Sequence, residues 1–322
     1  MLSIGNIPIP SSLILAPMAG ISDQPYRLVN RAFGCEFAFT EMTSAAALAY
    51  RSGRTLERLS ILPEDRPLGI QIVGADPEIL KMALDVIHEY SFDTIDFNAA
   101  CPVRKVAGKG KGAGLLLEPL KLQKLLKVIV KNTSLPVTVK IRSGWDETSV
   151  NAVDIALCAE DAGIQGLIIH GRTRDQRYKG RVDYSIIRKV KEALTIPVIA
   201  SGDALTPALV RQMFEETGCD GVALARGALG NPWIFPQTMA LLQNGTVLPA
   251  PDIDEKIRVI REHLAATIDF YGEKLGVILF RKFMAWYTKG LPIKELRGKA
   301  FGARTGDEMF HLISRVQAHI AA

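Results

Sequence analysis

The chain has 322 residues, of which 48% are hydrophobic and 23% charged, and its formal net charge is +5. This composition is typical of a globular protein with a substantial core, and the length suits one large domain and a small one. No apolar run approaches the roughly 18 residues of a membrane span, and no signal-peptide pattern opens the chain. The four cysteines form no CxxC pair, which excludes the common zinc and disulfide frameworks. We therefore expect a cytoplasmic protein with no metal and no membrane partner.

Short apolar segments alternate with helical patterns over residues 1–243. Without polar alternation, such segments favour parallel strands covered on both faces. The expected strands are Leu13–Ala19, Glu36–Met42, Leu68–Gly74, Thr94–Ala99, Val137–Arg142, Gly166–His170, Val198–Ser201 and Gly221–Arg226. The expected helices include Pro77–Tyr90, Pro119–Asn132, Val150–Ala162, Tyr184–Leu194 and Pro207–Thr217. Eight such units predict an α/β fold, a (β/α)8 TIM barrel. A doubly wound sheet would usually carry GxGxxG after its first strand, and that motif is absent.

The pattern changes after Phe235. Asn244–Asp252 is rich in turn formers and is typical of a linker. Helical patterns without strands follow at Ile253–Tyr271, Leu275–Thr288 and Gly306–Ile320. We therefore predict a catalytic barrel over residues 1–243 and a small all-α domain over residues 250–322.

The middle of this C-terminal region is strongly basic. From Lys274 to Arg304 it carries eight lysine and arginine residues against one acid, Glu295. The interleaved aromatic residues are Phe280, Phe283, Trp286, Tyr287 and Phe301. Basic and aromatic residues together suit the phosphates and bases of single-stranded nucleic acid, although spacings of three also suit core packing.

Polar residues stand at the end of nearly every expected barrel strand, where TIM-barrel enzymes carry their active sites. The residues at these ends, most of them polar, are Pro17-Met18-Ala19, Glu41, Gln71, Asn98, Lys140, Arg142, His170, Ser201-Gly202-Asp203 and Ala225-Arg226. The last two motifs follow the seventh and eighth strands, where barrels often hold a phosphate, and Arg226 can add charge-assisted hydrogen bonds to it. Any one of these residues could fill a polar layer of the barrel, but a complete ring predicts a cofactor and substrate site.

Cys101 is the most distinctive candidate in this ring. It follows the fourth expected strand, and the loop beyond it holds Arg104, Lys105, Lys109 and Lys111. A thiol in an electropositive barrel mouth can act as an acid or a nucleophile. The other three cysteines stand near strand starts or within a helix, where cysteine usually acts as a small hydrophobic residue; they are Cys35, Cys158 and Cys219.

These motifs resemble the tRNA-dihydrouridine synthase family, in particular its B-type bacterial members. The matching stretches are LAPMAGISDQPYR (15–27), IQIVGADP (70–77), IDFNAACPVRKV (95–106), VTVKIRSGW (137–145), IIHGRTR (168–174), PVIASGD (197–203), ARGALGNPWIF (225–235) and RKFMAWYTKGLP (281–292). They cover essentially the whole chain in the family's order. Three positions depart from the family's usual pattern: Ala100 and Ala225 replace glycine, and Ser201 replaces asparagine.

The resemblance implies a flavoenzyme that reduces uridine in tRNA to 5,6-dihydrouridine with NADPH, and no obligate protein partner. Cys101 would protonate C5 of uracil while the reduced flavin delivers hydride to C6. The base would be flipped out of the RNA stack to reach the flavin. The implied FMN-binding residues are Pro17, Met18, Ala19, Gln71, Lys140, Ser201, Gly202, Asp203, Ala225 and Arg226, with His170 beside them. The expected RNA contacts are Asn98, Arg142, Arg172, Arg281 and Lys282.

Three alternatives remain open at this point. The same reaction could act on ribosomal RNA, or an FMN barrel could act on a small molecule, as dihydroorotate dehydrogenases do. A third alternative is an RNA-binding module whose barrel is inactive. A small-molecule enzyme would not need the basic C-terminal region, whereas RNA phosphates explain it. The presence of Cys101, Lys140 and His170 argues against an inactive barrel. The motifs do not specify which uridine is modified.

Overall fold

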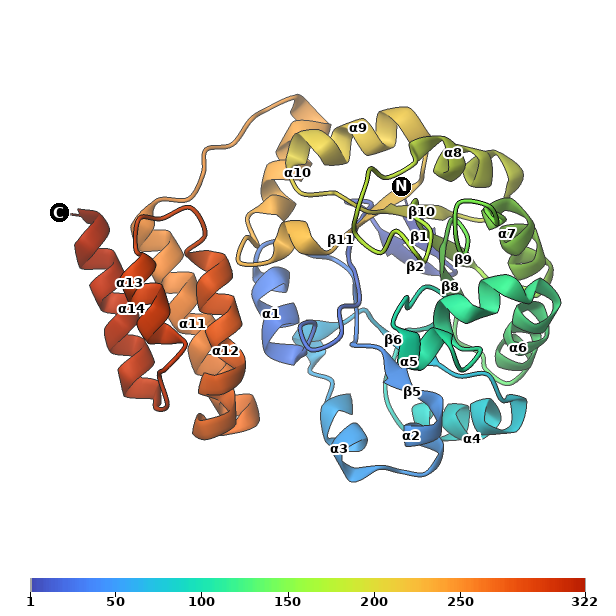
Figure 1. Cartoon of the computed structure of the whole chain (residues 1–322), viewed down its shortest axis with the longest axis horizontal. Coiled ribbons are helices and arrows are strands. Elements are labelled where there is room, and N and C mark those ends of the chain that lie inside the picture. The colour runs from blue at the N-terminus through green and yellow to red at the C-terminus, as the bar shows by residue number, and fades with distance from the viewer. Residues whose placement is uncertain (1, 322) are drawn as a thin grey trace.

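The computed structural model describes residues 2–321 and contains a closed barrel of parallel strands (Figure 1). Each barrel strand pairs with the next along the chain, and the last pairs with the first, which closes the barrel. The barrel strands are β3 (Leu13–Leu15), β4 (Ala38–Phe39), β6 (Leu68–Val73), β7 (Thr94–Asn98), β8 (Val137–Arg142), β9 (Gly166–His170), β10 (Val198–Ser201) and β11 (Gly221–Leu224). A short strand, β5 (Thr43–Ser44), also pairs with β6. The predicted (β/α)8 barrel is confirmed.

Helices surround the barrel. They are α1 (Gln24–Ala32), α2 (Ala45–Ala49), α3 (Gly53–Leu56), α4 (Pro77–Ile87), α5 (Arg104–Ala107), α6 (Pro119–Lys131), α7 (Ala152–Asp161), α8 (Tyr184–Ala193), α9 (Pro207–Thr217) and α10 (Ile234–Asn244). Short 3-10 turns lie at η1 (Glu57–Leu59), η2 (Pro63–Asp65), η3 (Gly112–Leu117) and η4 (Arg226–Ala228). The expected helices are present with small shifts at their ends. Proline begins α4, α6 and α9, where its missing N–H costs no hydrogen bond.

The barrel interior is half apolar and half polar. Alternate strand residues point inward, and on β3, β4 and β9–β11 these are mainly apolar, as at Ile14, Phe39 and Ile199. The N-terminal hairpin of β1 (Leu2–Ile4) and β2 (Ile7–Ile9), which the sequence patterns did not predict, packs its apolar side chains against this half. On β6–β8 the inward positions are instead polar; they are Gln71, Thr94, Asp96, Asn98, Thr138, Lys140 and Arg142. The outward side chains of these strands belong to the core beneath the helices.

Four helices form a bundle beside α1 (Figure 1). They are α11 (Ile253–Tyr271), α12 (Glu273–Tyr287), α13 (Lys294–Ala300) and α14 (Gly306–Ala321). Of the predicted linker Asn244–Asp252, residues 245–252 contain no regular secondary structure, while Asn244 ends α10. One hydrophobic core runs through the barrel helices and the bundle. The division into domains at 1–243 and 250–322 therefore remains a prediction about independent folding. None of the described helices is long and apolar enough to cross a membrane.

The aromatic residues of the basic region lie mainly inside the bundle. Phe280 and Phe283 are fully buried and Tyr287 nearly so, while Trp286 is partly buried and Phe301 is 52% exposed. The spacing of Phe280, Phe283 and Tyr287 places them on the inner face of α12. Of the two alternatives for these aromatics, burial supports core packing for Phe280, Phe283 and Tyr287.

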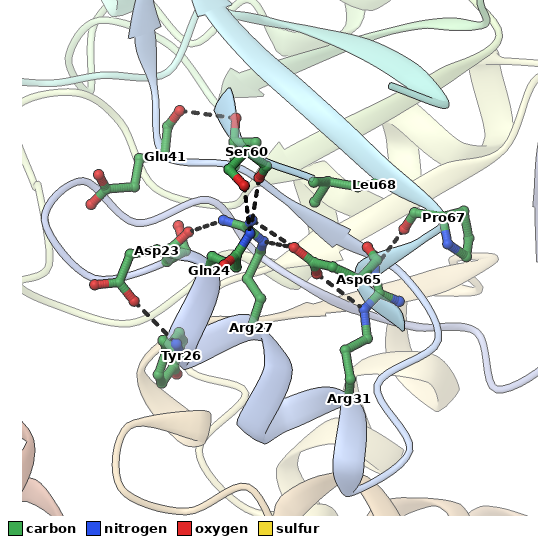
Figure 2. Close-up of polar contacts among 12 residues, drawn as sticks. Asp23, Gln24, Tyr26, Arg27, Arg31, Glu41, Ser60, Asp65, Pro67 and Leu68 are labelled. Atoms are coloured by element: carbon green, nitrogen blue, oxygen red, sulfur yellow. Dashed lines mark hydrogen bonds and ion pairs between the residues drawn. The ribbon is translucent and has the colours of Figure 1, made fainter. Parts of the chain in front are cut away.

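Buried ion pairs tie α1, on which the bundle packs, to the loop before β6 (Figure 2). Arg27 donates to Asp65 Oδ2 from Nε at 2.9 Å and from Nη2 at 2.6 Å, and neither side chain is more than 2% exposed. Arg31 donates to the carbonyl oxygens of Asp65 and Pro67. Asp23 caps α1 by accepting the N–H of Tyr26 at 3.1 Å. These contacts fix the helix that carries the bundle to the barrel.

Candidate active site

The C-terminal ends of the barrel strands meet at one mouth, which gathers most of the predicted site residues. Pro17, Met18 and Ala19 follow β3, and Gln71 lies on β6. Asn98 ends β7 and Cys101 follows it, while Lys140 and Arg142 end β8. His170, Ser201-Gly202-Asp203 and Ala225-Arg226 complete the ring on β9, β10 and β11. Arg281 and Lys282 lie outside this ring, on α12.

Hydrogen bonds on two sides hold the loop of Cys101. Asn98 Oδ1 accepts the backbone N–H groups of Ala100 at 3.1 Å and Cys101 at 2.8 Å. Arg142 Nε donates to the carbonyl of Ala100 at 2.8 Å, and the N–H of Ala113 donates to the carbonyl of Cys101 at 3.1 Å. Ala100 is not among the described residues with positive φ, so alanine replaces the family's glycine without backbone strain. The partly exposed thiol of Cys101 is thus carried on an ordered loop at the mouth.

The other cysteines fit the expected packing role. Cys35 and Cys219 are buried. Burial raises the pKa of Cys35 to about 11 and also raises the pKa of Cys219. Cys158 is partly buried on the outer helix α7.

Lys140 offers an ammonium group to the mouth. It is partly exposed, and in the described part of the chain its Nζ has neither a hydrogen-bond partner nor an ion-pair partner. Burial and the nearby Arg142 cation lower the pKa of Lys140 to about 8, while the Asp96 carboxylate opposes that shift. An ammonium with free donors suits an anionic or carbonyl-bearing ligand.

His170 is neutral in the site. Burial lowers its pKa well below the ordinary value, and the cations of Arg142, Lys140, Arg172 and Arg226 lower it further. Arg172 Nη1 lies 3.5 Å from His170 Nε2, which favours the tautomer with the proton on Nδ1. This mouth is electropositive, because most of its charged groups are basic.

Arg172 does not have the position that the sequence predicts for an RNA contact. Its side chain is only 2% exposed and is paired with Asp203, from Nη1 at 3.0 Å and from Nη2 at 2.5 Å. It also donates to the carbonyls of Lys179 and Gly180. With its donors engaged inside the protein, Arg172 holds the β9–α8 loop, and its expected contact with RNA is corrected accordingly.

Arg142 is also largely buried, with 3% exposure. Besides Ala100, it donates to the carbonyls of Thr173 and Arg177 from Nη1, so it joins the loops after β7 and β9. Its Nη2 donates to no protein acceptor in the described region, which leaves that group for a ligand.

Tyr178 is a mouth residue that the sequence patterns missed. It is 59% exposed, and the Arg226 guanidinium lies 4.9 Å from its ring centroid. Arg142 lies 5.9 Å from the same ring, and the His170 ring centroid is 6.3 Å away. An exposed aromatic ring between cations suits stacking on a planar group. The sequence feature that could have indicated Tyr178 is its position in a basic loop, R-D-Q-R-Y-K (174–179).

The loops after β10 and β11 have the donors for a phosphate group. Arg226 Nη2 donates to Asp203 at 2.6 Å and is 39% exposed. Within the described chain, the backbone N–H groups of Gly202, Asp203, Arg226 and Gly227 donate to no backbone acceptor. Gly202 has φ of +116°, and an added Cβ would lie 2.7 Å from the His170 ring. Two loops with free amides beside an arginine match the phosphate-binding end of many TIM barrels.

Arg281 and Lys282 are engaged with the protein. Arg281 donates to the carbonyl of Ala303 in the bundle, and Lys282 Nζ donates to the carbonyl of Gly20 in the loop after β3. Burial lowers the pKa of Lys282, while Asp23 and Glu41 oppose that shift. Lys282 therefore joins the bundle to the barrel mouth, and its contact with RNA remains a prediction.

A parallel barrel that presents a thiol, a lysine and phosphate-type donors at one mouth has the architecture of TIM-barrel enzymes. Comparison with known proteins specifies the class further. The model of the family "Dihydrouridine synthase (Dus)" matches residues 14–318, so the chain belongs to the dihydrouridine synthase family.

Curated relatives agree over nearly the whole chain. A protein named tRNA-dihydrouridine synthase B from Pseudomonas putida is 38% identical over 318 residues, which is 99% of this chain and 92% of the relative. A probable tRNA-dihydrouridine synthase from Rickettsia bellii is 39% identical over 92% of each chain. Among solved structures, a 2-naphthoyl-CoA reductase complex has a TM-score of 0.59 at 12% identity over 73% of this chain and 51% of its own. That likeness shows the fold alone.

Proposed function

We propose that this enzyme uses FMN and NADPH to reduce uridine in tRNA to 5,6-dihydrouridine. The observation that carries the proposal is the meeting of the Cys101 loop, the unpaired Lys140 ammonium and the phosphate-type donors beside Arg226 at one barrel mouth. The relatives named tRNA-dihydrouridine synthase support the RNA substrate.

The residues fit the two ends of FMN. The free amides of the β10 and β11 loops and Arg226 would hold the phosphate. Lys140 would face the N1–C2 edge of the ring, where a cation stabilises the charge of the reduced form. Gln71 stays a predicted FMN contact, and its amide is engaged by Asp96 and Asn98. When bound and reduced, the flavin supplies the hydride for C6 of uracil.

The protein's own task is to hold the uracil and to deliver a proton. Hydride addition at C6 leaves enolate-like charge over C5 and C4, and the Cys101 thiol donates a proton to C5. The second amide hydrogen of Asn98 and Nη2 of Arg142 are the donors left to orient the base. The uridine must leave the RNA stack to enter this mouth.

The test is Cys101→Ala. We expect this variant to bind FMN and to oxidise NADPH like the unaltered enzyme. Its rate of dihydrouridine formation should fall by about 10²–10⁴-fold, the usual contribution of a general acid. Cys158→Ala is the matched control, because Cys158 lies on the outer helix α7, and it should keep full activity. A Cys101→Ala enzyme that modifies RNA at the unaltered rate would contradict the assignment.

Two measurements separate the remaining alternatives. Purified protein should carry one FMN per chain, and a protein that takes up no FMN would overturn the cofactor proposal. Dihydrouridine mapped across total RNA of a deletion strain should disappear from tRNA. Loss from ribosomal RNA instead would reassign the substrate, and loss from neither would favour a small-molecule substrate.

A further inference from the structure

A chain of hydrogen bonds runs from a buried carboxylate to the backbone of Cys101. Gln71 Nε2 donates to Asp96 Oδ2 at 2.6 Å, and Asn98 Nδ2 donates to Gln71 Oε1 at 2.9 Å. Asn98 Oδ1 then accepts the N–H groups of Cys101 at 2.8 Å and Ala100 at 3.1 Å. Asp96, Gln71 and Asn98 are all at most 6% exposed, so water does not compete for these groups.

The strand register builds this chain. Gln71, Asp96 and Thr138 are direct neighbours across β6, β7 and β8. Asn98 lies two residues further along β7, on the same face and nearer the mouth. Asp96 is fully buried, deeper in the barrel than Asn98, so its carboxylate reaches neither the mouth nor a bound uracil.

Asp96 also determines the direction of the chain. An ionised carboxylate only accepts hydrogen bonds, so Gln71 must turn its NH2 group toward Asp96 and its oxygen toward Asn98. Asn98 must in turn present its NH2 group to Gln71, which leaves its oxygen for the two backbone N–H groups. Every donor in the chain points toward the carboxylate, and such chains strengthen cooperatively.

We propose that Asp96 is a positioning residue for the proton donor: its carboxylate orders the Gln71 and Asn98 amides and thereby holds the Cys101 backbone at the barrel mouth. The proposal deepens the proposed function, since it takes Cys101 to be the proton donor. Thr138 completes the acceptor by donating to Asp96 Oδ1 at 2.7 Å.

The negative charge of Asp96 also affects Lys140 on the neighbouring strand β8. Lys140 is the register partner of Asn98, and the Asp96 carboxylate is the group that raises the Lys140 pKa against burial and Arg142. In return, Lys140 and the hydrogen bonds from Gln71 and Thr138 lower the pKa of Asp96, which burial raises to about 6. The Gln71 and Thr138 donors and the nearby Lys140 cation therefore favour the ionised form of the carboxylate.

The test measures hydrogen exchange at the amides of Ala100 and Cys101 by NMR, in protein without flavin or RNA. Asp96→Leu removes the acceptor at similar volume, and we expect both amides to exchange about tenfold faster, since a typical hydrogen bond contributes about that factor. Gln71→Met breaks the chain at its middle link and should give the same result if Asp96→Leu does not fold. Other bonds of this loop, from Arg142 and Ala113, remain in both variants.

Thr138→Val is the matched control, because it removes the other hydrogen bond to the same carboxylate without touching the chain to Cys101. Its amides at Ala100 and Cys101 should exchange like those of the unaltered protein. Unchanged exchange in Gln71→Met, or equal acceleration in Thr138→Val, would overturn the proposal. The hydrogen-exchange measurement needs no substrate, so its outcome is independent of the activity assay. The positioning role of Asp96 can therefore be disproved while dihydrouridine formation is confirmed, and it can be supported while dihydrouridine formation is disproved.

A second variant, Asp96→Asn, separates the hydrogen-bonding role of Asp96 from the effect of its charge on Lys140. Asp96→Asn keeps the shape and can still accept from Gln71, with the Thr138 hydroxyl turning to accept from the new amide. We expect Asp96→Asn to retain slow exchange at Ala100 and Cys101. The reactivity of Lys140 toward reductive methylation should rise at neutral pH, because a larger fraction of its amine is unprotonated. Unchanged methylation would contradict the electrostatic part of the proposal.

Discussion

Lys140 shows how one side chain at the mouth depends on its surroundings. Its ammonium has no protein partner in the described residues, and its pKa is lowered to about 8 by burial and by Arg142. The group is therefore charged at neutral pH but loses its proton within the range in which enzymes are assayed. As the proposed cofactor ligand, Lys140 would make catalysis pH-dependent.

We predict an alkaline limb near pH 8 for dihydrouridine formation. As the pH rises through the Lys140 pKa, the ammonium is lost, and kcat/KM should fall by up to tenfold for each pH unit above about 8. Lys140→Arg keeps a cation to higher pH and should move the limb upward, although its different shape lowers the maximum rate. A limb at the same pH in both enzymes would show that another group controls it.

At the scale of elements, the loop and short helix that follow Cys101 differ from Arg281 and Lys282 of α12 in how their cations are engaged. Arg104 and Lys105 on α5 and Lys109 just after it are exposed. None of these three cations forms an ion pair in the described residues, and the next acid along the chain, Glu118, pairs with Lys121. On α12, by contrast, Arg281 and Lys282 donate to backbone carbonyls of the protein. RNA phosphates would therefore meet free cations beside Cys101.

We predict that the α5 cations contribute more to RNA affinity than the α12 pair. Arg104→Ala with Lys105→Ala and Lys109→Ala should reduce the salt slope of RNA binding by about one unit for each lost phosphate contact. Arg281→Ala with Lys282→Ala should weaken RNA binding with a smaller change of slope, and should also lower the melting temperature. Binding titrations over a salt series measure both slopes. Equal slopes for the α5 variant and the unaltered protein would assign the phosphate contacts elsewhere.

At the scale of the whole molecule, ionisable groups are buried where the bundle packs against the barrel. His263 of α11 is fully buried, and its Nδ1 lies 3.1 Å from the Tyr287 hydroxyl. The His263 ring is 6.1 Å from that of Tyr26 on the barrel helix α1. Burial lowers the pKa of His263 to about 3, and the Lys282 cation adds to that shift. On the same interface, burial raises the pKa of Asp23 to about 6.

We predict that His263 makes the folded state sensitive to acid. Below about pH 6.5 the unfolded chain protonates this histidine, while the folded chain does not. As the pH decreases from about 6.5 to about 3, the free energy of unfolding therefore decreases by up to about 1.4 kcal/mol per pH unit. Asp23 opposes this between about pH 6 and pH 3.8, because there the folded state binds the extra proton. His263→Phe should therefore lose less stability between pH 7 and pH 5 in denaturant titrations.

Tyr287→Phe is the control for this comparison. It removes the same hydrogen bond but keeps the histidine, so it should lower stability at both pH values and retain the acid sensitivity. If His263→Phe shows the same loss from pH 7 to pH 5 as the unaltered protein, His263 does not control the acid response.

The barrel and most of its mouth could be predicted from the sequence, because both follow from local signals. Apolar segments of strand length, proline at helix starts and glycine at helix ends are properties of neighbouring residues. Once eight parallel strands are recognised, their ends must meet at one face, which brings Cys101, Lys140 and Arg226 together without further information. The family resemblance then supplied the expected roles.

The tertiary structure alone decided which charged residues are free and which are engaged. Arg172 follows the end of one expected strand and Lys140 lies near the end of another, yet Arg172 pairs with Asp203 while the Lys140 ammonium has no protein partner in the described chain. Phe280, Phe283 and Tyr287 of α12 pack in the core. Asp96 reaches the Cys101 backbone only through Gln71 of the neighbouring strand β6 and Asn98 of its own strand β7. Such pairings depend on strand register and on packing between distant segments. Local sequence patterns contain the residues but not the distances between them.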